Sequence, residues 1–123
     1  MTARAFRLVL PIDELHNSNH RGHWSIKARK RASMRHAAFL AARTLDPILG
    51  PVALTVTFGF PDHRRRDLDN YEAKGAIDGA VDAGLITDDR STILQSVTRV
   101  PAKDVTPHGY AVLTFTFRPV GEV

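Results

Sequence analysis

The segment VALTVTFGF, from Val52 to Phe60, constrains the fold more tightly than any other part of the chain. Its apolar residues recur at every second position, so one side of the segment carries Val52, Leu54, Val56, Phe58 and Phe60. Thr55 and Thr57 fall on the opposite side. A period of two residues is that of a β-strand with one buried face. The chain is therefore expected to build a sheet and to cover one side of it.

Three further segments have the composition of strands. The first, from Ala5 to Ile12, is apolar and is interrupted at Pro11. The other two are TILQSVTRV, residues 92–100, and YAVLTFTF, residues 110–117. Between them lies PAKDVTPHG, which has the proline and glycine of a turn. We therefore expect a sheet of about four strands.

Two helices are expected between these strands. One runs from about Ser25, a possible N-cap, to about Thr44, and the Asp-Pro pair at 46–47 closes it. The other begins after Asn70, a good capping residue, and ends at Gly84, a good C′ residue. The second helix has an apolar stripe formed by Ala73, Ile77, Ala80 and Val81. The order strand, helix, strand, helix, strand, strand predicts one small α+β, or mixed α/β, domain over residues 1–123.

The composition is that of an ordinary globular protein without disulfides. The chain has 123 residues, of which 43% are hydrophobic and 24% charged, which suits a single domain with one core. It has no cysteine, so a reducing compartment is acceptable. No stretch approaches the roughly 20 apolar residues of a membrane span, and the first apolar run, broken by Arg7, is too short for a signal peptide. We expect a cytoplasmic protein without a membrane partner.

Positive charge is concentrated in the N-terminal third. The formal net charge is +4 and the pI is about 10, which favours a polyanionic partner, nucleic acid before acidic lipid. From His16 to Arg43 there is no acid. Such a run either contacts phosphates or forms an ordinary solvated helix face. We expect it to contribute DNA contacts from Arg21, Lys27, Arg29, Lys30 and Arg31.

Other residues of the chain bear on nucleic-acid binding as well. The triplet Arg64-Arg65-Arg66 adjoins the acidic segment described next and is expected to hold DNA phosphates. Trp24 either stacks on an exposed base or belongs to a core or an interface. The spacing of three histidines would suit zinc, but phosphate or backbone hydrogen bonds are favoured for His16, His20 and His23.

Negative charge is gathered in one segment of this basic chain. Eight of the thirteen acids lie between Asp62 and Asp89, and clustered carboxylates repel one another unless a cation lies among them. In an extended segment Asp67 and Asp69 would project to one side, while Leu68 anchors in the core. Such a pair suits Mg²⁺, which takes one or two carboxylates and leaves its other positions to water and phosphate. The alternative is a pair of turn and cap acids at a helix N-terminus.

Further charges flank the second helix. Asp88 and Asp89 are adjacent in the following loop, where they either serve a site or belong to a solvated turn. Lys74 either pairs with Asp78 at i+4 or reaches toward the carboxylates and a phosphate.

The segments RRRDLDN, a lysine, and IDGAVDAGLITDD follow one another in this order. Together they resemble the RusA family of Holliday junction resolvases, whose acidic block has D-x-D-N, a helix with a lysine and an aspartate, an AG turn and a terminal DD. The N-terminal third is also similar. Its first strand ends at Leu10-Pro11, and HNSNHRGHWSIKARKR is an Asn/His/Arg-rich entry to a basic helix. The resemblance covers nearly the whole chain.

The resemblance implies a homodimeric, Mg²⁺-dependent endonuclease that resolves four-way DNA junctions by paired symmetric phosphodiester hydrolysis. Asp67, Asp69 and Asp89 match the essential metal-binding acids, Asp88 matches their acidic neighbour, and Lys74 matches the lysine that supports catalysis. A non-catalytic protein that binds branched DNA is the alternative, and a metal-dependent nuclease of another preference is a third possibility. The sequence gives neither the number of metal ions nor the preferred cutting site.

Two points of spacing bear on these assignments. The tripeptide YEA separates DLDN from Lys74, one residue more than in the best-known member, and one helical residue is about 100° of rotation. Lys74 keeps its place if the extra residue lies in the loop before the helix. A helix from Asn70 to Ala83 would be about 20 Å long, a distance that five loop residues barely span. Either the helix is shorter, or Asp88 and Asp89 reach the site of a neighbouring subunit.

Overall fold

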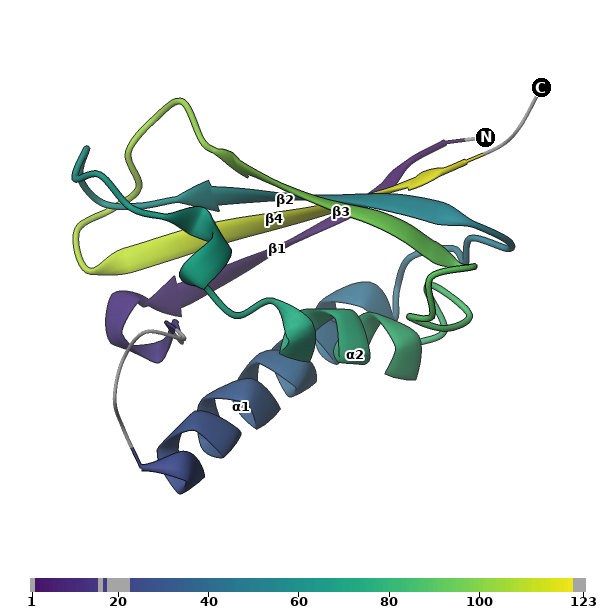
Figure 1. Cartoon of the computed structure of the whole chain (residues 1–123), viewed down its shortest axis with the longest axis horizontal. Helices are drawn as coiled ribbons and strands as arrows, with labels where there is room; N and C mark the ends of the chain where they lie inside the picture. The colour runs from purple at the N-terminus through teal and green to yellow at the C-terminus, as the bar shows by residue number, and fades with distance from the viewer. Residues whose placement is uncertain (1, 16, 18–22, 121–123) are drawn as a thin grey trace.

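A mixed four-stranded sheet forms one layer of the molecule and two helices form the other (Figure 1). The computed structural model describes residues 2–15, 17 and 23–120. The strands are β1 (Arg4–Pro11), β2 (Val52–Gly59), β3 (Leu94–Pro101) and β4 (Tyr110–Pro119). The helices are α1 (Trp24–Ala42) and α2 (Lys74–Asp82), with short 3₁₀ helices η1 (Ile12–Glu14) and η2 (Leu68–Asn70). The predicted α+β class and all four predicted strands are confirmed.

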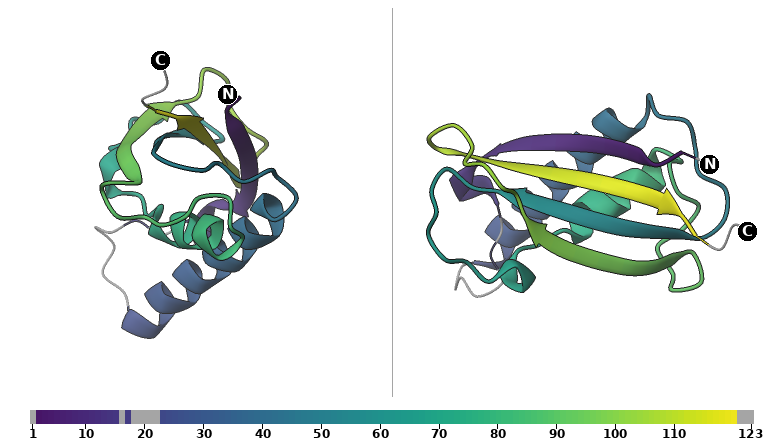
Figure 2. Two further views of the ribbon diagram at one scale, coloured as in Figure 1. Left: turned by 90° about the vertical axis from the view of Figure 1, so that its right-hand side faces the viewer. Right: turned by 90° about the horizontal axis from the view of Figure 1, so that it is seen from above.

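The sheet order is β1-β4-β2-β3. Strand β4 pairs antiparallel with both β1 and β2, whereas β2 and β3 are parallel. Parallel neighbours need a crossover connection, and here the crossover contains α2. Both helices lie against the same face of the sheet (Figures 1 and 2). Because β2 and β3 run parallel, the loops that follow them leave the sheet at the same end of the molecule.

The alternation along β2 gives the buried face that the sequence predicts. Val52, Leu54, Val56 and Phe58 are at most 1% exposed, whereas Thr55 and Thr57 are partly exposed on the other face. The neighbouring strands add aromatic rings to the same core, and Phe6 stacks on Phe115 with 5.1 Å between ring centroids. Burial of these side chains from water is the main stabilising contribution to the layered fold.

Helix α1 begins one residue earlier than predicted and is capped by a different residue. The Nδ1 atom of His23, and not the side chain of Ser25, accepts a backbone hydrogen bond at the N-cap, from the amide of Ser25 at 3.2 Å. The buried residues of α1 are Met34, Ala38 and Ala42, spaced four apart. The first ten residues of α1 include no buried residue, and the helix extends beyond the sheet there (Figure 1). No helix within the described residues is long and apolar enough to cross a membrane.

Helix α2 is shorter than predicted, because Asn70 is not its cap. Asn70 belongs to η2, where its amide donates to the Asp67 carbonyl at 3.1 Å. The helix starts at Lys74, whose amide donates to the Glu72 carboxylate at 2.6 Å. At the other end Gly84 has a φ of +77°, as expected of a C′ glycine. Four residues that were predicted to be helical therefore lie outside α2.

Two glycines let α2 approach α1 closely. A Cβ atom on Gly79 would lie 2.4 Å from the Arg35 carbonyl oxygen and 2.7 Å from the Ala38 Cβ. A Cβ atom on Gly75 would lie 2.6 Å from the Arg31 carbonyl oxygen. Neither helix backbone can yield that much space without shifting. The position of α2, and of the segments on either side of it, therefore depends on this contact.

Candidate active site

Asp67 and Asp69 lie in the segment that connects β2 to α2. Asp67 precedes η2, and its Oδ1 atom accepts the amide hydrogen of Asp69 at 3.1 Å. The expectation of an extended segment is wrong here, because this side-chain hydrogen bond closes a 3₁₀ turn. The predicted anchoring of Leu68 is confirmed, since its side chain packs against the core. Both carboxylates are on exposed residues.

The two carboxylates differ in what they contact. One oxygen of Asp67 is used in the turn, so the turn-and-cap interpretation describes part of its role. The Asp69 carboxylate forms no hydrogen bond or ion pair with any residue that the structure describes. Unpaired carboxylate oxygens at the surface are the ligands that hard divalent cations prefer. The donor chemistry of this pair therefore fits Mg²⁺.

Lys74, the first residue of α2, connects the two ends of the crossover. Its Nζ atom lies 3.0 Å from Asp78 Oδ1 and also contacts Asp89 Oδ2 in the loop after the helix. The pairing with Asp78 is confirmed, and Lys74 also reaches one of the site acids, Asp89, while its contact with a phosphate stays a prediction. The hydrogen bond to Asp89, followed by that to Asp78, raises the pKa of Lys74 above its ordinary value. Lys74 therefore stays an ammonium at neutral pH.

Asp88 has a different environment from its neighbour. Its Oδ1 atom accepts the amide hydrogens of Asp89 at 2.7 Å and Arg90 at 3.2 Å, and its Oδ2 atom accepts Arg90 Nε at 2.9 Å. The side-chain hydrogen bond from Arg90 is the main reason why the pKa of Asp88 is lowered. Asp88 therefore fixes the shape of the loop, while the carboxylate of Asp89 faces Lys74.

The two spacing questions raised by the sequence have structural answers. The additional residue of YEA lies in the non-helical segment before α2, so Lys74 keeps its place at the start of the helix. The helix has nine residues, which is about 13 Å at the usual rise. The loop after it is anchored by the buried side chains of Leu85 and Ile86 and returns far enough for Asp89 to contact Lys74. The helix is therefore shorter than predicted, and Asp89 reaches Lys74 of its own chain.

The three acids matched to the metal site do not converge in the single chain. Within residues 2–15, 17 and 23–120, no three His, Asp or Glu side chains lie close enough together to hold a metal ion. Asp89 is held by Lys74, whereas Asp67 and Asp69 belong to the segment that precedes the helix and form no contact with Lys74 that the structure describes. A three-acid centre therefore needs either a rearrangement of Lys74 or an acid from a second copy.

The basic residues of α1 are partly engaged with acids elsewhere in the chain. Arg29 pairs with Glu14 at 3.2 Å, and Arg31 with Glu72 at 2.8 Å. The Lys30 ammonium donates to the Asp13 carbonyl at 2.5 Å. Lys27 forms no ion pair within the described residues. Since surface ion pairs are weak, these contacts leave the cations able to exchange partners.

The arginine triplet is divided in a way that its sequence does not show. Arg66 is held by Asp62 at 2.8 Å and lies over the Phe60 ring, 4.1 Å from its centroid. The side chains of Arg64 and Arg65 form no ion pair with a described residue. The exposed guanidinium groups of Arg64 and Arg65 are thus available to bind phosphates beside the acids, whereas that of Arg66 is engaged by Asp62 and Phe60.

Other predicted residues lie elsewhere or outside the described chain. Arg21, His16 and His20 lie outside the described residues. His23 serves as the N-cap of α1, as noted above, in a backbone hydrogen bond of the kind that was favoured. Trp24 is 74% exposed and stacks on the His23 ring, so it is not a core residue.

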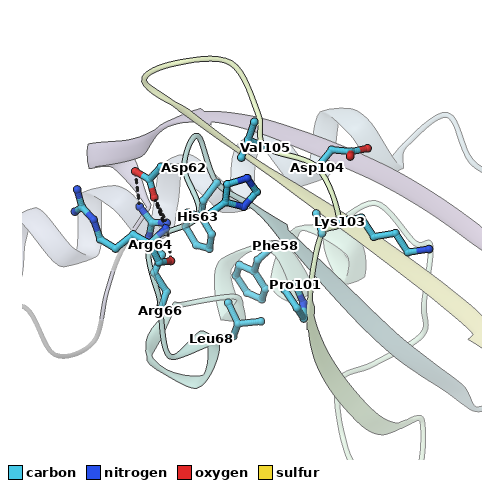
Figure 3. A pocket seen from close by; sticks show the side chains of 12 residues that line it. Phe58, Asp62, His63, Arg64, Arg66, Leu68, Pro101, Lys103, Asp104 and Val105 are labelled. Carbon is cyan, nitrogen blue, oxygen red and sulfur yellow. Dashed lines mark hydrogen bonds and ion pairs between the residues drawn. The ribbon is translucent and has the colours of Figure 1, made fainter.

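A cavity beside the acidic segment was not predicted. It has a volume of about 400 Å³ and opens between the segment after β2 and the turn between β3 and β4 (Figure 3). Its lining includes Phe58, Phe60, Leu68, Arg66 and Pro101. The phenylalanines are core residues, as predicted, but sequence reasoning missed the cavity because it did not bring the distant turn between β3 and β4 into contact with the segment after β2.

No protein-family model matches the chain. Among curated proteins, the crossover junction endodeoxyribonuclease RusA of Escherichia coli K12 is 31% identical over 108 residues, which cover 86% of this chain and 87% of that protein. The protein of the same name from Enterobacteria phage 82 is 32% identical with the same coverage. A shorter match, 39% identical over 66 residues, is to RusA of Shigella sonnei and covers 54% of this chain and 52% of that protein.

Proposed function

The chain belongs to the RusA family of crossover junction endodeoxyribonucleases, and we propose on that basis that it cuts four-way DNA junctions. The relatives carry the name of this activity and match most of the chain. The observation that best supports the proposal is the contact between Lys74 and Asp89. It brings the loop with the terminal acids to the start of α2, five residues after Asp69.

We propose that Asp67, Asp69 and Asp89 hold Mg²⁺. The fit rests on the donor set, since three carboxylates are hard oxygen ligands and the Asp69 carboxylate forms no hydrogen bond or ion pair with a described residue. When bound, such an ion activates a water molecule, neutralises the phosphate and assists the leaving oxygen. Asp88 keeps the loop in the shape that presents Asp89, through its hydrogen bonds to the Asp89 and Arg90 amides.

Lys74 has the properties of an electrostatic group. Its raised pKa keeps it protonated at neutral pH, so it does not serve as a general base. An ammonium near the scissile phosphate would stabilise the negative charge that develops during hydrolysis. If Lys74 leaves Asp89 when DNA binds, the Asp89 carboxylate becomes free to bind the metal ion.

A homodimer would complete the site and match the substrate. A four-way junction presents two symmetry-related strands, and a two-fold dimer presents two identical sites to them. That no three acids converge in one described chain also supports a site completed by a second copy. Arg64, Arg65 and Lys27, and the exchangeable cations of α1, would hold the flanking phosphates.

Cleavage of a synthetic four-way junction tests the proposal. The junction is compared with linear duplexes of the same arms, with Mg²⁺ and with EDTA, for the wild type, Asp69→Asn and the control Asp46→Asn, which removes an exposed acid in the loop after α1. We expect cleavage of the junction only, with Mg²⁺ only, by the wild type and the control. Tight junction binding without any cut would instead favour the non-catalytic, branched-DNA-binding alternative.

Mixed protomers test whether the site is shared. Asp67→Asn and Asp89→Asn chains are mixed, unfolded and refolded together. If each site takes Asp67 and Asp69 from one chain and Asp89 from the other, half of the sites in a mixed dimer are intact, and cleavage of one strand returns. If cleavage never returns although mixed dimers form, each site is built within one chain.

A further inference from the structure

The cavity beside η2 has an apolar floor made by two distant parts of the chain. Phe58, Phe60 and Leu68 come from the end of β2 and the segment after it, while Pro101 ends β3 and Val105 lies in the turn between β3 and β4 (Figure 3). Phe58 and Phe60 are core residues, 1% and 9% exposed, so the more accessible apolar surface of the floor comes from Leu68, Pro101 and Val105. A floor of this kind suits a ligand with an apolar face.

The rim of the cavity is polar and carries a positive excess. Arg64, Arg66 and Lys103 contribute three cations, against two acids, Asp62 and Asp104. Asp62 and Arg66 neutralise each other through hydrogen bonds of 2.8 Å and 3.4 Å, which leaves Arg64 and Lys103 against Asp104. The rim therefore favours a ligand that carries a negative charge beside its apolar part.

One cation of the lining, Arg66, is held in place by the fold. The Arg66 side chain is 11% exposed, because it is held between the Phe60 ring and the Asp62 carboxylate. A guanidinium ordered in this way loses little conformational freedom on binding. Arginine planes and aromatic rings are the surfaces on which proteins stack unpaired bases.

The cavity also adjoins the residues proposed to hold the metal. Leu68 lines it, and the residues on either side of Leu68 are Asp67 and Asp69. A nucleotide whose phosphate reached those acids would therefore place its base, or that of its neighbour, at the cavity. At a junction the bases at the crossover have lost part of their stacking, so moving one out of the helix costs least there.

We propose that the cavity receives an unstacked base of the DNA beside the phosphate that is cut, and that its fit to the base sets the preferred cutting sequence. This inference rests on the proposed function, since it assumes that a phosphate is cut near Asp67 and Asp69. Polar groups on the rim, His63 among them, supply the hydrogen bonds that could distinguish one base edge from another.

A variant that narrows the cavity tests the proposal. Val105 lies on the turn and is 48% exposed, so Val105→Phe adds bulk at the cavity without entering the core. The control is Leu49→Phe, since Leu49 is 80% exposed in the loop before β2, at the opposite end of the sheet from the cavity. Each protein is given a set of junctions that differ only in the base pairs at the crossover.

We expect the wild type and Leu49→Phe to prefer one junction over the poorest by about tenfold or more, and Val105→Phe to show a preference of less than about threefold. The Kd for the junctions should stay within about threefold in all three proteins, because phosphate contacts supply most of the affinity. An unchanged preference in a folded Val105→Phe protein would overturn the proposal. Absence of cleavage by the wild type would instead overturn the proposed function.

A second measurement needs no cavity variant. The wild-type protein is mixed, in EDTA, with junctions that carry 2-aminopurine at single positions around the crossover, since its fluorescence rises when the base leaves the stack. We expect a rise of about threefold or more at the position beside the cut phosphate, and a smaller one at positions further along the arms. Equal fluorescence at all positions, bound or free, would contradict an unstacked base.

Discussion

The ammonium of Lys74, at the start of α2, contacts the carboxylate of Asp89, fifteen residues later in the chain. This contact joins the two halves of the acidic segment that flank the crossover helix. It also places a permanent cation among carboxylates that would otherwise repel one another. The concentration of acids in a basic chain is therefore balanced locally, by Lys74 and by arginines of neighbouring segments.

Replacement of Lys74 by methionine should lower the rate of junction cleavage by about 100-fold or more, because a charge aimed at the reacting phosphate is lost. The free energy of unfolding should fall by less than about 1 kcal/mol, since the lysine and its partners are partly exposed. Single-turnover cleavage and urea unfolding measure the two effects. Arg118→Met, which removes an exposed cation from β4, is the control. An equal loss in both variants would show that only overall charge matters.

The two adjacent acids of the loop should not be equivalent. Asp89→Asn should abolish most of the cleavage, because it removes a proposed ligand of the metal. Asp88→Asn should have a smaller effect, since an asparagine oxygen can still accept the amide hydrogens of residues 89 and 90. Cleavage rates of both variants, with circular dichroism to verify folding, test the difference. Loss of cleavage to the same extent in a folded Asp88→Asn protein would contradict the distinct roles.

Local patterns in the sequence predict the sheet well and the site only in part. The alternation of β2 and the Pro- and Gly-bearing turn before β4 are local signals, and all four strands follow from them. The start of α2 was misplaced because Asn70 is a good capping residue in sequence. In the structure Asn70 belongs to η2, whose first turn includes the hydrogen bond from the Asp69 amide to the Asp67 side chain, and α2 begins only after Ala73.

The partners of charged side chains could not be predicted for a related reason. The run of cations from Lys27 to Arg35 has no acid within it, so its sequence indicates a free basic face. The acids that pair with it come from η1, from the segment before α2 and from α2 itself. Only the packing of the helices brings these groups together. The resemblance to a family supplied the site acids, but not the contact between Lys74 and Asp89.

The close approach of α1 and α2 makes Gly79 intolerant of a side chain. Gly79→Ala should lower the free energy of unfolding by about 1–3 kcal/mol, because the added methyl group meets backbone and Ala38 at less than van der Waals distance. This loss outweighs the gain in helix propensity. Urea unfolding at constant m-value measures it. The control Ser33→Ala, at an exposed position of α1, should change the free energy of unfolding little. An unchanged free energy of unfolding in Gly79→Ala would contradict the close contact of the two helices at this position.

The ion pair between Arg35 and Asp82 should stabilise the protein in a pH-dependent way. The hydrogen bond from Arg35 lowers the pKa of Asp82 below its ordinary value of 3.8. A carboxyl group with a lower pKa in the folded state adds stability above its unfolded pKa, and that stability is lost as pH falls through the folded pKa.

Asp82→Asn should therefore have a slightly lower Tm than the wild type at neutral pH, and the difference should vanish once the pH is below the folded-state pKa of Asp82. Thermal unfolding followed from pH 7 downward measures it. Asp104→Asn, which removes an acid without an ion pair among the described residues, should show no such difference at any pH. A difference that persists unchanged in acid would contradict the electrostatic origin.

We propose that the acidic segment forms a metal-dependent site that makes two symmetric cuts in each four-way junction. A supercoiled plasmid with an extruded cruciform tests it most directly, because two symmetric cuts in one encounter yield a linear molecule and a single cut yields a nicked circle. With Mg²⁺ we expect the wild-type protein to yield linear product with symmetric ends at the cruciform. We expect no product in EDTA and none from the Asp69→Asn variant. Linear product from Asp69→Asn, or an uncut plasmid that the wild type binds in Mg²⁺, would contradict it.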